Sequence, residues 1–153
     1  GRIFHHALLA ASEGGTFEAE KANRVNKRMP ELEAGITGGK WQDLVPACDS
    51  AFPTAGKTDV SLPSDRFEAQ IACEELAGFA SVALEGSERD FGNELAGYRR
   101  MRTELNDAIG PGLRARAGSS SEAQSRERDR ALAAAAALGS PIPVLDKCRE
   151  RFK

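Results

Sequence analysis

Three cysteines have the most distinctive chemistry in this chain, because a thiol can form a disulfide, ligate a metal or act as a nucleophile. Cys48 and Cys148 lie in matching boxes, each with an aliphatic residue three positions before the cysteine and a phenylalanine four positions after it. Offsets of three and four share one helical face, so each cysteine should face buried apolar surface. Cys73 lies in an equally helical pattern. The flanking residues are Val45 and Phe52 in the first box and Leu145 and Phe152 in the second.

The spacing of these residues argues against metal binding and against thiol catalysis. A structural zinc site takes four cysteine or histidine ligands, usually in close pairs, whereas the three cysteines are isolated. The two histidines, His5 and His6, are adjacent, and we interpret them as a solvated terminal pair. A catalytic cysteine needs a base within reach, and the spacing places none beside a thiol. We therefore predict no metal, no cofactor and no catalytic residue.

A disulfide is the sharpest hypothesis that the three thiols support. A bridge from Cys48 to Cys73 would close a loop of about 25 residues and stabilise by ~3.5 kcal/mol, whereas one from Cys73 to Cys148 would close about 75 residues and give ~4.5 kcal/mol. This difference does not select a pairing. We favour Cys48 with Cys73, because the long loop after Cys48 returns to the helix of Cys73, and leave Cys148 free or as the alternative partner. The other interpretation is three buried free thiols.

Other side chains that could do chemistry are scattered along the chain. Carboxylate pairs such as Glu74 with Glu75 fall on polar helical faces and are interpreted as solvated surface. Residues 35–40 superficially match a P-loop but lack the spacing GxxxxGK[ST]. The second half is rich in arginines mixed with carboxylates, which is typical of an ion-paired helical surface. These arginines are Arg99, Arg100, Arg102, Arg114, Arg116, Arg126, Arg128 and Arg130.

Composition predicts a single all-α domain over residues 1–153. Hydrophobic residues make up 41% and charged residues 29%, while the aromatics that favour strands make up only 6%. The net charge of -2 gives no attraction to nucleic acid. No apolar run approaches the ~20 residues of a membrane span. We expect neither nucleic-acid binding nor a membrane span, and the oligomeric state stays open.

Helical periodicity and breaker residues predict a bundle of five or six helices with a central antiparallel hairpin. The hairpin comprises about 66–85 and 88–109, and residues 110–112, with the sequence Gly-Pro-Gly, should end its second helix. Helical periodicity also occurs over 3–12, 17–28, 41–52, 122–138 and 141–152, and mobile segments are expected near 1–2, 53–63 and 112–121. The predicted core residues are Trp41, Leu44, Phe52, Ile71, Leu76, Phe79, Phe91, Leu95, Tyr98, Leu105, Leu145 and Phe152.

For function, the residues support two classes. The leading hypothesis is an exported, noncatalytic helical protein that binds a partner protein or surface component, in the periplasm or outside the cell, with the cytoplasm as the alternative. The second is a small-molecule or anion-binding protein, or an enzyme, whose site is assembled from scattered arginines and carboxylates. A concave pocket with convergent arginines and carboxylates would favour the second class.

Overall fold

The computed structural model describes residues 2–25, 27–28, 38, 45–85 and 88–152, and the regular structure of these residues is entirely helical. The all-α prediction is therefore confirmed. Residues 19–25 and 27–28 are helical, and the predicted core residues Trp41 and Leu44 lie outside the described residues. The other helices are α1 (Arg2–Ala10), α3 (Val45–Ala51), α4 (Arg66–Ala83), α5 (Glu88–Ala117), α6 (Ser121–Leu138) and α7 (Pro141–Arg151).

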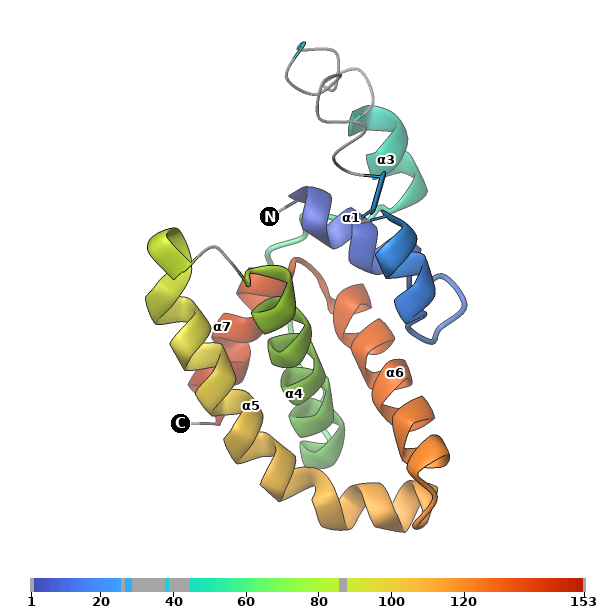
Figure 1. The fold of residues 1–153 in the computed structure, drawn as a ribbon, viewed down its shortest axis with the longest axis vertical. Helices are drawn as coiled ribbons and strands as arrows, with labels where there is room; N and C mark the ends of the chain where they lie inside the picture. The colour runs from blue at the N-terminus through green and yellow to red at the C-terminus, as the bar shows by residue number, and fades with distance from the viewer. Residues whose placement is uncertain (1, 26, 29–37, 39–44, 86–87, 153) are drawn as a thin grey trace.

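Helix α4 is the centre of the molecule and packs against α5, α6 and α7 (Figure 1). It begins where the sequence predicts, because the Asp65 side chain accepts a hydrogen bond from the Glu68 amide at 2.8 Å. Helix α5 runs back beside α4, and α6 returns along another side of α4 (Figure 1). The alanine-rich face of α6 buries Ala135 and Ala136 in the core, and these small side chains allow α6 to lie close to α4.

Helix α5 is longer than predicted. The expected stop at Pro111 was wrong, because the helix continues through it to Ala117. Leu113 is buried beyond the proline in a cluster with residues of α4 and α5, and the Phe67 ring lies where a Cβ of Gly112 would otherwise be. This packing outweighs the local cost of the proline. Most of the segment 112–121 predicted as mobile is therefore helix.

The structure corrects the favoured disulfide pairing. Cys73 of α4 is bonded to Cys148 of α7, with their Cα atoms 5.7 Å apart, whereas Cys48 is an exposed free thiol. The pairing was missed because helical faces predict burial but not which helices meet. The inward direction predicted for Cys148 is correct, and that predicted for Cys48 is wrong.

The core follows the predicted pattern in α4, α5 and α7, with one exception. Six of the predicted core residues are buried: Ile71, Leu76, Leu95, Tyr98, Leu105 and Leu145. Phe52, Phe79 and Phe152 are half-buried. Phe91 was wrongly placed in the core, because the residue is 44% exposed and the backbone of α5 departs from helical geometry there.

The loop 53–63 has no helix or strand, as predicted, but it is joined to the rest of the fold. Val60 is buried in the main core. The Ser140 amide donates to the Lys57 carbonyl at 2.7 Å, at the turn between α6 and α7. Gly139 in this turn has a φ of 153°, and a Cβ there would lie 2.7 Å from the same carbonyl oxygen. The predicted mobility of this loop stays a prediction.

Among the described residues, no single helix is both long and apolar enough to cross a membrane. Helices α6 and α7 would pass such a test only as a pair, and they are bent by 107° relative to one another.

Candidate functional site

The two histidines lie inside the fold, so their interpretation as a solvated pair was wrong. His5 is completely buried, and its Nε2 donates to the Ala136 carbonyl at 2.8 Å while its Nδ1 accepts from the Gly56 amide at 3.2 Å. Burial lowers the pKa of His5, because the charged ring would lose its hydration. His5 is thus a neutral ring that joins α1, α6 and the loop 53–63. His6 Nε2 lies 3.3 Å from Asp49 Oδ1 of α3.

A buried ionic cluster joins α4, α5 and α6 at carboxylates that the sequence placed on solvated surface. The Glu74 side chain is only 2% exposed, and Arg128 Nη1 of α6 donates to both Glu74 and Glu75 at 2.5 Å. From α5, Arg102 Nε donates to Glu74 at 3.4 Å, and Asn106 Oδ1 accepts from Arg128 Nη2 at 2.9 Å. The interpretation as a solvated pair was therefore wrong for both carboxylates.

The cluster holds two carboxylates close to one shared guanidinium, and this environment shifts the pKa of Glu75. The pKa of Glu75 is raised to about 7, because burial and the adjacent Glu74 carboxylate raise it and Arg128 offsets only part of their effect. Burial and the Glu75 charge also raise the pKa of Asp129 on α6. Desolvation lowers the pKa of Arg128, but hydrogen bonds and charge attraction from Glu75 and Glu74 together outweigh it, so the pKa is raised. Because these side chains pair with one another across α4, α5 and α6, we interpret the cluster as a structural junction.

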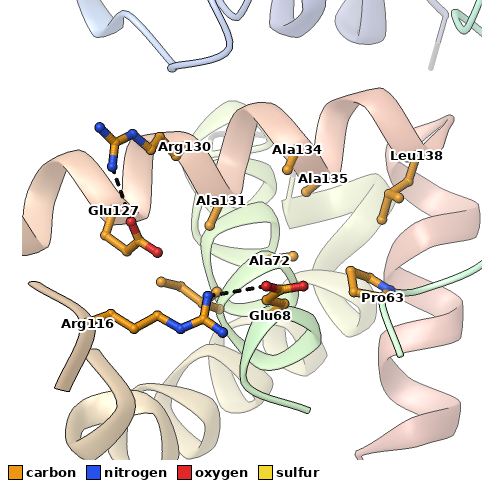
Figure 2. A pocket seen from close by; sticks show the side chains of 11 residues that line it. Pro63, Glu68, Ala72, Arg116, Glu127, Arg130, Ala131, Ala134, Ala135 and Leu138 are labelled. Carbon is orange, nitrogen blue, oxygen red and sulfur yellow. Dashed lines mark hydrogen bonds and ion pairs between the residues drawn. The ribbon is translucent and has the colours of Figure 1, made fainter. Parts of the chain in front are cut away.

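A slot between α4 and α6 does bring scattered arginines and carboxylates to one concave surface (Figure 2). Its volume is about 210 Å³. Arg116 donates to Glu68 at 3.2 Å, and Arg130 lies 3.5 Å from Glu127. Arg116 also lies over the Phe67 ring, 4.7 Å from its centroid. This α4–α6 slot is lined by Pro63, Glu68, Ile71, Ala72, Arg116, Glu127, Arg130, Ala131, Ala134, Ala135 and Leu138.

A second concavity, the apolar groove, lies where α1, α4, α5 and the start of α7 meet. Its volume is about 300 Å³, and Glu94 is the only charged residue among the described residues that line it. Phe91 and Ile142 lie at this groove, and each residue is 44% exposed. The non-helical backbone at Phe91 lies in the same place. The lining residues are Phe4, Ala80, Leu84, Phe91, Glu94, Tyr98, Ser140, Pro141 and Ile142.

The structure brings together four of the eight arginines singled out in the sequence, in two different places. Arg102 and Arg128 meet the buried carboxylates, whereas Arg116 and Arg130 line the α4–α6 slot. Two sequence signals could have pointed to the buried cluster. Glu74 lies beside the buried Cys73 on α4, and Gly78, one turn later, leaves room for the Arg102 side chain. A Cβ at Gly78 would lie 3.0 Å from Arg102 Nε.

Nothing in the described part of the chain gathers three or more histidine, cysteine, aspartate or glutamate side chains in a way that could hold a metal ion. In comparisons with known proteins, no family model, no curated protein and no solved structure matches this chain.

Proposed function

We propose that this chain is an exported, noncatalytic helical binding protein that receives an apolar side chain of a partner protein in the apolar groove. The observation that carries the proposal is the position of the large hydrophobic residues that stay exposed. Among the described residues these are Val82, Phe91 and Ile142, and two of the three line one groove. Clustered exposed apolar side chains around a concavity are typical of an interaction site.

The size and charge of the groove indicate which chemistry the partner presents. A cavity of about 150 Å³ holds a benzene molecule, so the volume of about 300 Å³ accommodates an aromatic or large aliphatic side chain. Of the described residues on the lining, Glu94 alone is charged. A basic residue next to the apolar anchor would complement it and orient the partner. The proposed partner segment is therefore apolar on one face and basic beside it.

The cysteine pairing supports export. Structural disulfides persist in oxidising compartments and are rare where glutathione keeps thiols reduced. The bond between Cys73 and Cys148 lies in the buried core, where both cysteines are fully covered. A periplasmic or secreted location accords with this bond, and the cytoplasm remains the alternative location.

A defined probe tests the groove. A fluorescein-labelled amphipathic peptide with leucine on one face and lysine beside it should bind, as measured by fluorescence anisotropy, and the same peptide with glutamate for lysine should bind much more weakly. Ile142→Ser should weaken binding on the order of tenfold, because it removes an apolar contact at the groove. Glu94→Gln should weaken binding of the lysine peptide and reduce its dependence on salt.

Val82→Ser is the matched control, because Val82 is exposed by 67% but does not line the groove. It should leave the affinity unchanged. Equal losses in Ile142→Ser and Val82→Ser, or equal affinity for the lysine and glutamate peptides, would contradict the proposal.

A second candidate function is the binding of a small charged molecule in the α4–α6 slot. The observation in its favour is that Arg116 and Arg130 meet Glu68 and Glu127 at one concave surface. If this candidate holds, a small ligand perturbs amide resonances at the slot, and filling the slot abolishes the effect.

A further inference from the structure

We propose that the α4–α6 slot binds a small zwitterion with an apolar tail, of which an apolar α-amino acid is the simplest example. This proposal rests on the second candidate function above and names its ligand class. It is independent of the apolar groove, which lies on other residues of the fold.

The charges at the slot alternate in sign, and this selects the ligand's head group. Two arginines and two carboxylates converge there as the pairs Arg116 with Glu68 and Arg130 with Glu127 (Figure 2). A ligand with only negative charge would be repelled by both carboxylates, and a ligand with only positive charge would be repelled by both arginines. A head group with both charges can place its carboxylate at an arginine and its ammonium group at a glutamate.

The head-group contacts are partly organised before any ligand arrives. Arg116 is held by the ring of Phe67, by Glu68 and by Asp65, whose Oδ1 lies 3.6 Å from Arg116 Nη2. Glu127 is the more covered of the two carboxylates, with its side chain 23% exposed. Holding these groups in place reduces the entropy lost when a ligand binds.

The rest of the slot is apolar and small, which selects the ligand's tail. Ala131, Ala134 and Ala135 form one wall on α6, and Leu138 with Pro63 lies at the end away from Arg130 and Glu127 (Figure 2). The volume of about 210 Å³ suits a branched aliphatic side chain with its backbone atoms. Burial of this tail supplies the favourable apolar term, and the charges supply the orientation.

The test is a titration of the full chain, followed by two-dimensional amide NMR, with three probes of the same carbon skeleton. L-leucine has both charges, 4-methylpentanoate lacks the ammonium group, and L-leucinamide lacks the carboxylate. L-leucine should shift resonances of slot residues in a saturable way, and each singly charged analogue should bind on the order of tenfold more weakly.

Variants separate the slot from the rest of the surface. Ala134→Phe should abolish the shifts, because it fills the slot from an exposed position that tolerates a larger side chain. Arg116→Gln should weaken the binding of L-leucine on the order of tenfold. Arg126→Gln is the matched control, because Arg126 forms an exposed pair with Glu122 on α6 outside the slot. It should bind L-leucine as the unaltered protein does.

The outcomes distinguish this proposal from the function on which it rests. If 4-methylpentanoate binds as tightly as L-leucine and Arg116→Gln weakens both, the slot is an anion site and the zwitterion proposal is wrong. If none of the probes shifts a slot resonance, the slot is not a small-molecule site and both ideas are wrong. Shifts that survive Ala134→Phe would place the binding elsewhere and contradict the proposal.

Discussion

At the scale of single residues, Glu75 has the most unusual chemistry in the structure. Its pKa is raised from 4.5 to about 7, so the folded chain holds a proton there that the unfolded chain has already released at the same pH. A group of this kind stabilises the fold fully below pH ~4.5, and its contribution is lost as pH rises through about 7. The groups that face it are Glu74, Arg128 and Asp129.

Glu75→Gln should therefore raise the free energy of unfolding at pH 8 by about 1 to 3 kcal/mol, because glutamine keeps an oxygen for Arg128 and removes a charge from the carboxylate pair. Urea unfolding from pH 4.5 to pH 8 measures the effect. The difference from the unaltered protein should grow as pH rises. The matched exposed variant Glu122→Gln should show no such growth. A constant difference between Glu75→Gln and the unaltered protein across this range would contradict the assigned protonation.

At the scale of the elements, the path of α5 beyond Pro111 depends on one close contact. The Phe67 ring occupies the space where a side chain at residue 112 would begin. Gly112→Ala should destabilise the protein by about 1 to 3 kcal/mol, because the ring must move in a packed layer. Gly97 lies in the same helix and has no atom within 4 Å of its would-be Cβ. Gly97→Ala should stabilise by about 0.5 to 1 kcal/mol, since alanine favours helix.

Thermal and urea unfolding of the two variants compare these effects directly. Opposite signs for the two glycine substitutions are the expected result. A stabilising Gly112→Ala would mean that α5 does not follow the observed path against Phe67.

The same contact shows how far sequence reasoning reaches. The start of α4 is predictable because Asp65 and Glu68 are neighbours along the chain, and local spacing decides a helix cap. The end of α5 cannot be predicted in this way, because Phe67 and Gly112 are far apart in sequence and the packing between them outweighs the local effect of Pro111. The slot is beyond sequence reasoning for the same reason. Its four charged residues come from three helices, and only tertiary packing brings them together.

At the scale of the whole molecule, the disulfide closes a loop with a sequence separation of 75 residues. Reduction, or replacement of Cys73 and Cys148 by alanine, should lower the free energy of unfolding by about 3 to 5 kcal/mol. Cys48→Ser should change it by less than about 0.5 kcal/mol, because that thiol is exposed. Urea unfolding with and without reductant measures both. Alkylation of the unreduced, denatured chain followed by mass spectrometry should modify Cys48 alone, and three modified cysteines would contradict the pairing.

The order in which the chain is synthesised affects how the disulfide can form. Synthesis proceeds from the amino end, so Cys73 appears soon after Cys48 and long before Cys148. The partner available first is the wrong one. Correct oxidation must wait until α7 has been made and has docked on α4, or an early bond to Cys48 must be exchanged. Until α7 is made, the exposed Cys48 is thus a non-native partner that can compete for Cys73.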